Sequence, residues 1–146
     1  MADGSKPKTL NDLQRELPSI KDIGRIYAEV QLAEDYTAAI LSSSLMDTML
    51  RYLITSHLTP MGSDREDAIL GGQTGALNTF SSKIEKSYAM GLIGPETRGV
   101  LEIVRKVRNF FAHYASQGGF DIPEVLAECR KIRTPRIRFS FSHFDR

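Results

Sequence analysis

The spacing of apolar side chains between residues 100 and 113 predicts a helix that packs on a core. Apolar residues recur there at intervals of three and four positions, in a stripe made of Val100, Ile103, Val104, Val107 and Phe111. This spacing places them on one face of an α-helix. Pro95 suits the first turn of that helix. Arg108, Asn109 and His113 follow the stripe at its C-terminal end, with Arg108 at its border.

The same helical spacing runs through residues 20–58. Neither glycine nor proline interrupts the chain between Ile26 and Leu58. We therefore expect one long helix or two nearly collinear helices, with a break near residues 32–34, and we expect this segment to be central in the fold. Ser19 can cap its N-terminus, and a short helix over residues 10–17 precedes it.

The remaining segments predict shorter helices joined by polar loops. Residues 59–75 form a loop, with a helical turn within residues 65–70. A helix then begins after Asn78 or Thr79 and ends at Gly91 or Gly94; its buried stripe is expected to comprise Leu77, Phe80, Ile84 and Tyr88, and its water-facing residues Lys83, Glu85 and Lys86. Asp121 is expected to cap a last helix over residues 122–132, which turns Val125, Leu126 and Cys129 inward.

Together these segments predict a single-domain, all-α bundle of about five or six helices over residues 10–133. Residues 1–9 are expected to be a disordered tail. Residues 134–146 change period, because Ile137, Phe139 and Phe141 alternate with polar residues. We expect an extended C-terminal arm that docks on the bundle or on a neighbouring subunit. Its interleaved arginines and phenylalanines are also typical of a surface for single-stranded nucleic acid.

Composition limits the classes of function. The chain of 146 residues has a formal net charge of +1, without the basic excess of a free-standing DNA-binding domain, so direct DNA binding is not expected. A lone cysteine, Cys129, excludes an internal disulfide, and no apolar run reaches the ~18 residues that a membrane span needs, so a cytoplasmic protein is expected. No set of residues has metal-ligand spacing, and residues 71–75 lack the ending of a phosphate-binding loop, so neither metal nor cofactor is expected.

Arg108, Asn109 and His113 are the candidate site. A histidine can act as base or acid near neutral pH, an arginine can hold a phosphate, and Asn109 can orient either group. However, five helical residues place Arg108 and His113 about 140° apart, so they converge only if the helix ends between them or if two copies of the motif meet. The alternative is structural. Arg108 would then form an ion pair with Asp35, and His113 would bond the free carbonyls at its helix end.

This motif also carries a resemblance. Residues 108–113, Arg-Asn-Phe-Phe-Ala-His, resemble the Arg-polar-x-x-x-His signature of HEPN domains, which are all-helical bundles. Residues 81–93 resemble the corresponding helix of the mannitol operon repressor family, and the similarity extends from about residue 35 to residue 132. The HEPN resemblance implies a two-fold dimer in which His113 is the acid or base, Arg108 the phosphate clamp and Asn109 the support.

Three functions remain open. The repressor resemblance implies a cytoplasmic regulatory protein that acts in transcription through protein partners. The HEPN resemblance implies a metal-independent ribonuclease, such as the toxin of a toxin–antitoxin pair. The third is a small-ligand or nucleotide-binding module that uses Arg108 and the glycine-rich loop at residues 71–75. A regulator predicts that Arg108 and His113 are satisfied internally, and a nuclease predicts that both are exposed in a shared cleft.

Overall fold

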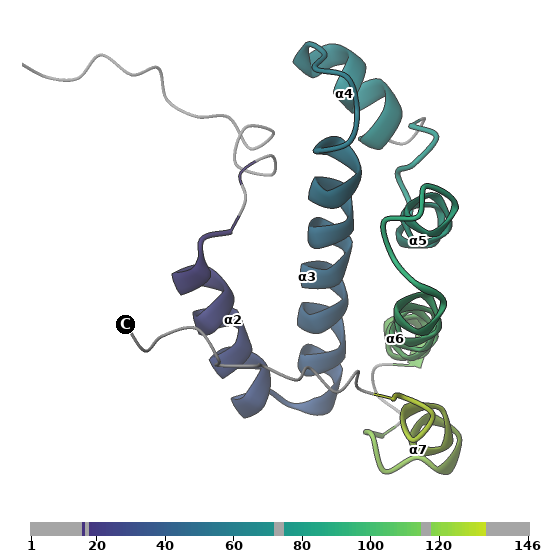
Figure 1. Ribbon diagram of the computed structural model, residues 1–146. Helices are drawn as coiled ribbons and strands as arrows, with labels where there is room; N and C mark the ends of the chain where they lie inside the picture. The colour runs from purple at the N-terminus through teal and green to yellow at the C-terminus, as the bar shows by residue number, and fades with distance from the viewer. Residues whose placement is uncertain (1–15, 17, 72–74, 115–117, 134–146) are drawn as a thin grey trace, which may run out of the picture.

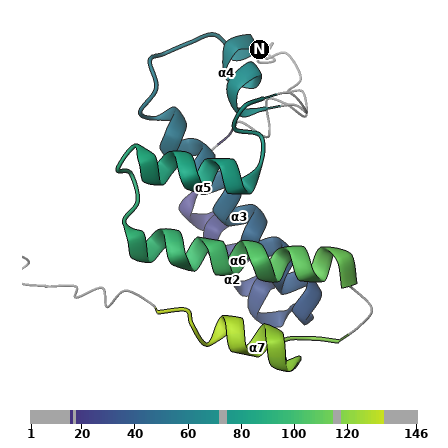
Figure 2. The same cartoon turned by 90° about the vertical axis from the view of Figure 1, so that its right-hand side faces the viewer.

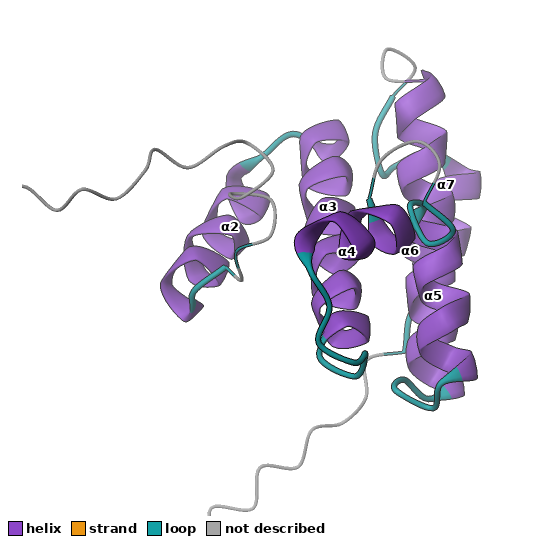
Figure 3. Cartoon of the chain, turned by 90° about the horizontal axis from the view of Figure 1, so that it is seen from above, coloured by secondary structure: helices purple, strands orange, loops and turns teal. Residues whose placement is uncertain are grey.

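The computed structural model describes residues 16, 18–71, 75–114 and 118–133. These residues form α-helices and loops and contain no strand, which confirms the all-α prediction (Figure 3). The helices are α2 (Ile20–Leu32), α3 (Asp35–Thr55), α4 (Ser63–Leu70), α5 (Phe80–Ala89), α6 (Pro95–Tyr114) and α7 (Pro123–Cys129). The predicted tail at residues 1–9, the helix at 10–17 and the arm at 134–146 lie outside the described residues, except for Glu16.

The long helix α3 is the centre of the bundle, as the sequence predicts. It packs against α2, α5 and α6, and α6 packs in turn against α5 and α7. Figure 1 shows α2 on one side of α3 and α5 and α6 on the other, with α4 across its C-terminal end. Figure 2 shows α5 and α6 side by side across α3, with α7 along the opposite edge of α6. None of these helices has the length and apolar composition that a membrane span requires.

The predicted break between α2 and α3 is present, but the two helices are not collinear. Ala33 and Glu34 both adopt extended backbone conformations, with ψ angles of 151° and 153°. Two extended residues between helices turn the chain, so α2 folds back beside α3 (Figure 1). The alternative of one continuous helix is therefore wrong. The physical reason is that α2 gains contact with α3 only when the chain reverses.

The core consists of two clusters of buried side chains on the α5 and α6 side of α3. The first joins Ala39 of α3 with Val107 and Phe111 of α6 and Val125 of α7. The second comprises Leu50 of α3, Ile84 of α5 and Leu101 of α6. The apolar stripe predicted for α6 is thus buried at Val107 and Phe111. At its N-terminal end Leu101, and not Val100, is the buried residue.

Local sequence signals correctly predicted both ends of α5. Thr79 caps α5, since its side chain accepts a hydrogen bond from the Ser82 backbone N–H. After α5, Gly91 adopts a φ of +70°, and the Leu92 and Gly91 N–H groups bond to the carbonyls of Ser87 and Tyr88. This is a Schellman motif, which requires a left-handed residue and so favours glycine.

Three boundaries differ from the predictions. The turn expected within residues 65–70 is the full helix α4, which begins at Ser63. The last helix is shorter than predicted and begins after Ile122, with no side-chain cap. Asp121 does not cap it, because the Asp121 carboxylate accepts a hydrogen bond from the Gly119 N–H instead.

Candidate functional site

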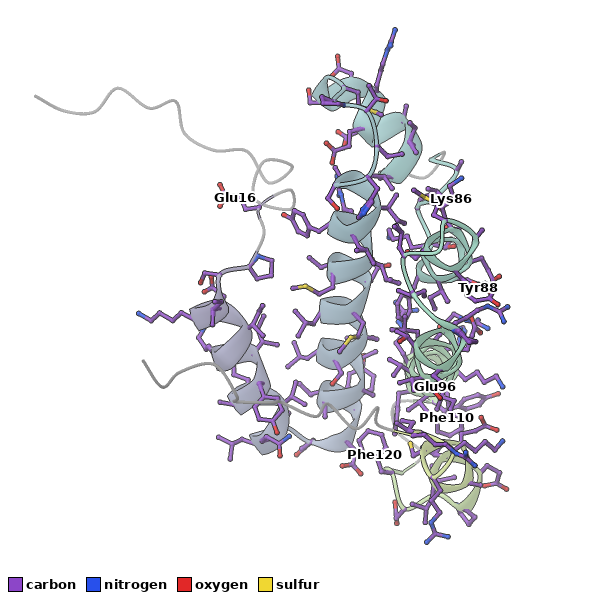
Figure 4. All side chains as sticks on the ribbon, in the orientation of Figure 1. Glu16, Lys86, Tyr88, Glu96, Phe110 and Phe120 are labelled. Atoms are coloured by element: carbon purple, nitrogen blue, oxygen red, sulfur yellow. The ribbon has the colours of Figure 1, made fainter. Side chains whose placement is uncertain are left out.

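An open groove lies on the face of α3 between α2 and the N-terminal end of α5. Its volume is about 980 Å³. It is lined by side chains from four helices and the segments next to them, namely Glu16, Pro18, Asp22, Arg25, Ile26, Ser43, Ser44, Asp47, Thr48, Arg51, Asn78, Thr79, Phe80, Lys83 and Arg108. In Figure 4, Glu16 lies on the α2 side of α3, whereas Tyr88 and Glu96 lie on its far side. The groove therefore lies on the side of α3 that faces α2.

Lys83 is buried at the wall of the groove. Only 3% of its surface is exposed, although the sequence places it on the water-facing side of its helix. Its Nζ donates to both carboxylate oxygens of Asp47, at 2.8 and 2.9 Å, and at 3.4 Å to the Asn78 carbonyl. The prediction that Lys83 faces water is therefore wrong. A buried lysine is stable when a carboxylate compensates its charge, and Asp47 on α3 supplies that partner.

The prediction for Tyr88, on the same helix as Lys83, is also wrong. The sequence places it in the buried stripe of α5, yet 41% of its surface is exposed. Its ring lies 5.1 Å from the guanidinium carbon of Arg98, which also donates to Glu85. The buried face of α5 is thus rotated toward Lys83, Ile84 and Ser87.

Two arginines on the groove already have acidic partners. Arg51 pairs with Glu66 at 3.2 Å and with Asp67 at 3.6 Å, both on α4. Arg25 lies 3.4 Å from Asp22 one turn earlier on α2. The Asp22 carboxylate also accepts hydrogen bonds from Ser19, and these bonds hold the pKa of Asp22 below its ordinary value of 3.8. The negative charge of Asp22 is therefore shared between the helix cap and Arg25.

Arg108 is the cation of the groove that has no carboxylate partner among the described residues. It is exposed, and its Nη1 donates to the Asn109 Oδ1 at 3.1 Å. This bond allows Asn109 to orient the Arg108 guanidinium. The predicted ion pair with Asp35 does not form between these two described residues. The Asp35 carboxylate instead accepts a hydrogen bond from the Phe120 N–H at 2.7 Å, which joins the start of α3 to the segment before α7. In Figure 4, Phe120 lies beside that start.

His113 lies apart from the groove. It is exposed in the last turn of α6, and its ring forms no hydrogen bond to another residue in the part of the chain described. Helix α6 continues through both residues to Tyr114, so Arg108 and His113 remain about 140° apart around one helix. A single chain therefore does not bring the two together. Among the residues that the structure describes, the expected bonds from His113 to helix-end carbonyls are not formed either.

The described residues also contain no group of three or more histidine, cysteine or acidic side chains that could hold a metal ion. The glycine-rich segment includes residues 72–74, which lie outside the described residues. Neither Gly71 nor Gly75 lines the groove that contains Arg108. Cys129 is half-buried, and burial raises the pKa of its thiol above the ordinary value.

The groove was missed at the sequence level because its wall depends on the burial of Lys83. A signal was nonetheless present. Phe80, Lys83, Ile84 and Ser87 follow the spacing i, i+3, i+4 and i+7 of a helix face. The buried face of this helix was predicted from apolar residues alone, so Tyr88 was placed on it and Ser87 was not. Asp47 lies on another helix, 36 residues from Lys83 in the chain, so spacing could not identify it as the partner.

Comparison with known proteins adds no relative: no family model matches the chain, and neither the curated proteins nor the solved structures include a significant match.

Proposed function

We propose that this chain is a cytoplasmic regulatory protein that acts through protein contacts, of which the first is with a second copy of itself. The observation that carries this proposal is the exposure of α2. No residue of α2 is buried, in contrast to the other described helices. Ile20, Tyr27 and Leu32 on α2 are 89%, 66% and 89% exposed.

The exposed apolar residues of α2 include a shared face. Ile20 and Tyr27 are seven positions apart, so they lie on one side of the helix. Gly24 lies between them on this side, and a Cβ placed there would meet no atom within 4 Å. Small residues between apolar ones allow a second helix to approach closely. We call Ile20, Gly24 and Tyr27 the free face of α2.

The charges of α2 favour pairing with an identical helix. Its N-terminal half contains Lys21, Asp22 and Arg25, two bases and one acid. Its C-terminal half contains Glu29, and Glu34 follows the helix. A two-fold axis brings the same surface of both copies together, so antiparallel α2 helices would place each basic half beside an acidic half. This complementarity is the reason for choosing a second copy as the occupant of the free face.

The mass of the particle in solution tests this contact. We expect wild type to sediment as a dimer, and Tyr27→Glu or Ile20→Glu to sediment as a monomer with an unchanged far-ultraviolet circular dichroism spectrum. Tyr88→Glu is the matched control, because Tyr88 is an exposed tyrosine of α5. It should remain dimeric. A monomeric wild type, or dimeric α2 variants, would refute the contact.

The regulatory role needs a test in cells. Transcripts that change when the gene is deleted should return to their normal level with wild type or Tyr88→Glu, but not with Tyr27→Glu at equal protein abundance. An unchanged transcript profile after deletion would contradict a role in transcription. Full restoration by Tyr27→Glu would show that the free face of α2 is not used.

A metal-independent ribonuclease of HEPN type is the second candidate, favoured by the exposure of both Arg108 and His113 on α6. Since the two side chains diverge in one chain, the site would need two copies. Purified protein should then cleave RNA in the presence of chelator, with a specific activity that rises with protein concentration. His113→Ala should abolish cleavage. Cleavage that survives His113→Ala, or no cleavage by wild type, would exclude this candidate.

A further inference from the structure

We infer that the groove between α2, α3 and α5 binds a small organic phosphate, with Arg108 as the residue that holds the phosphate group. The inference does not depend on self-association through α2, because Ile20 and Tyr27 do not line the groove. It also does not depend on ribonuclease activity, because His113 lies outside the groove.

The size of the groove suits a small molecule. Pockets that bind small ligands have volumes of about 300 to 1,000 Å³, and the groove has about 980 Å³. Its walls are mixed. Phe80 and Ile26 supply apolar surface, while the hydroxyl-bearing residues Ser44 and Thr48 face it from α3. Such a lining accommodates a ligand with both an apolar or aromatic body and polar groups.

The charges of the groove select the class of ligand. Four cationic side chains line it, Arg25, Arg51, Lys83 and Arg108, together with three carboxylates, Glu16, Asp22 and Asp47. The charge of Lys83 is compensated by Asp47, and that of Arg51 by two acids of α4. Arg108 is therefore the cation of the groove whose charge no carboxylate among the described residues compensates. An anion that enters the groove would find its strongest unshared attraction there.

The guanidinium of Arg108 is held ready for such an anion. Asn109 accepts a hydrogen bond from Nη1, and the other N–H groups of Arg108 have no bonding partner among the described residues. A planar guanidinium binds phosphate through two parallel hydrogen bonds, which is the reason for choosing a phosphate over a halide or another spherical anion.

Two further features of the groove support a doubly charged group. Arg25 is only weakly held, since its ion pair with Asp22 is 3.4 Å long and its side chain is 70% exposed. It is therefore available to a ligand at little cost. Thr79 and Phe80 at the N-terminus of α5 also line the groove, and helix N-termini favour negative charge.

The test measures binding of four probes to the full chain by isothermal titration calorimetry: adenosine 5′-monophosphate, ribose 5-phosphate, inorganic phosphate and adenosine. We expect both organic phosphates to bind more tightly than adenosine. We also expect adenosine 5′-monophosphate to bind more tightly than ribose 5-phosphate, because the base can contact Phe80 and Ile26. Arg108→Ala should weaken binding of the organic phosphates by about tenfold or more. Arg108→Lys should restore part of this loss, and His113→Ala should leave the affinity unchanged.

Arg98→Ala is the matched control, because Arg98 is an arginine of the same helix that bonds to Glu85 and does not line the groove. It should leave the affinity unchanged. Circular dichroism and melting temperature establish that each variant is folded. The inference is overturned if none of the phosphates binds at millimolar concentration, if adenosine binds as tightly as its monophosphate, or if Arg98→Ala weakens binding as much as Arg108→Ala does.

Discussion

Lys83 of α5 and Asp47 of α3 form an ion pair in which one ammonium group contacts both oxygens of one carboxylate. The lysine side chain is 4% exposed and the aspartate side chain 35%. The pair joins the two helices beside the apolar cluster of Leu50, Ile84 and Leu101. It also forms part of the groove wall, so the position of α5 against α3 and the shape of the groove depend on the same contact.

Removal of the aspartate from this pair should reduce stability more than removal of the lysine. Asp47→Ala leaves a buried ammonium without compensation, so we expect a loss of about 3 kcal/mol in the free energy of unfolding. Lys83→Met leaves a carboxylate that water can still reach and keeps the packing of the stem, so the loss should be about 1 kcal/mol. Urea denaturation measures both values. Lys106→Met, at an exposed lysine of α6, is the control. An equal loss for both variants would contradict this account.

Substitution of Phe111 and of His113, two positions apart on α6, should have very different effects on the free energy of unfolding. Phe111 is completely buried between α3, α6 and α7, so Phe111→Ala should cost about 3–5 kcal/mol. His113 is exposed and has no hydrogen bond to another described residue, so His113→Ala should change stability by less than about 0.5 kcal/mol. Thermal unfolding measures both. A large loss for His113→Ala would support the role of a helix-end brace that the sequence suggested.

Two glycines should respond in opposite directions to the same substitution. Gly91 has a φ of +70°, so Gly91→Ala should reduce stability by about 1–2 kcal/mol through backbone strain. Gly99 lies within α6, and a Cβ there would meet no atom within 4 Å. Gly99→Ala should therefore increase stability by about 1 kcal/mol, because alanine favours the helix. Chemical denaturation of the two variants checks the signs, and a gain for Gly91→Ala would contradict the Schellman geometry.

The N-terminus of α2 should weaken in acid. Because the pKa of Asp22 is lower in the folded chain than its ordinary value of 3.8, its contribution is complete above that value and is lost as the pH falls through the lowered pKa. Helical signal from α2 should therefore decrease below about pH 4. Asp22→Asn should remove this part of the pH dependence, whereas Asp64→Asn on α4 should not. Identical acid titrations of wild type and Asp22→Asn would rule out the cap as the cause.

The sequence predictions were correct where the deciding interactions lie within a few residues, and wrong where the interacting residues are far apart in the chain. Thr79, Gly91 and Pro95 act within one or two turns of chain, and the boundaries they predict agree with the structure. The error at Lys83 arose because its partner Asp47 is 36 residues away. The predicted partner of Arg108 was Asp35, but Asp35 bonds to the Phe120 backbone, a contact over 85 residues that spacing could not reveal.

The sequence by itself determined the all-α class, the central helix and the stripe that buries Val107 and Phe111. These follow from apolar periodicity and from local backbone preferences, which act between residues close in the chain. Only the tertiary structure decided that α2 folds back on α3, that Lys83 is buried, and that Arg108 lines a groove from which His113 is excluded. Those outcomes depend on which distant side chains meet to share charge and exclude water, and this is settled when the helices pack.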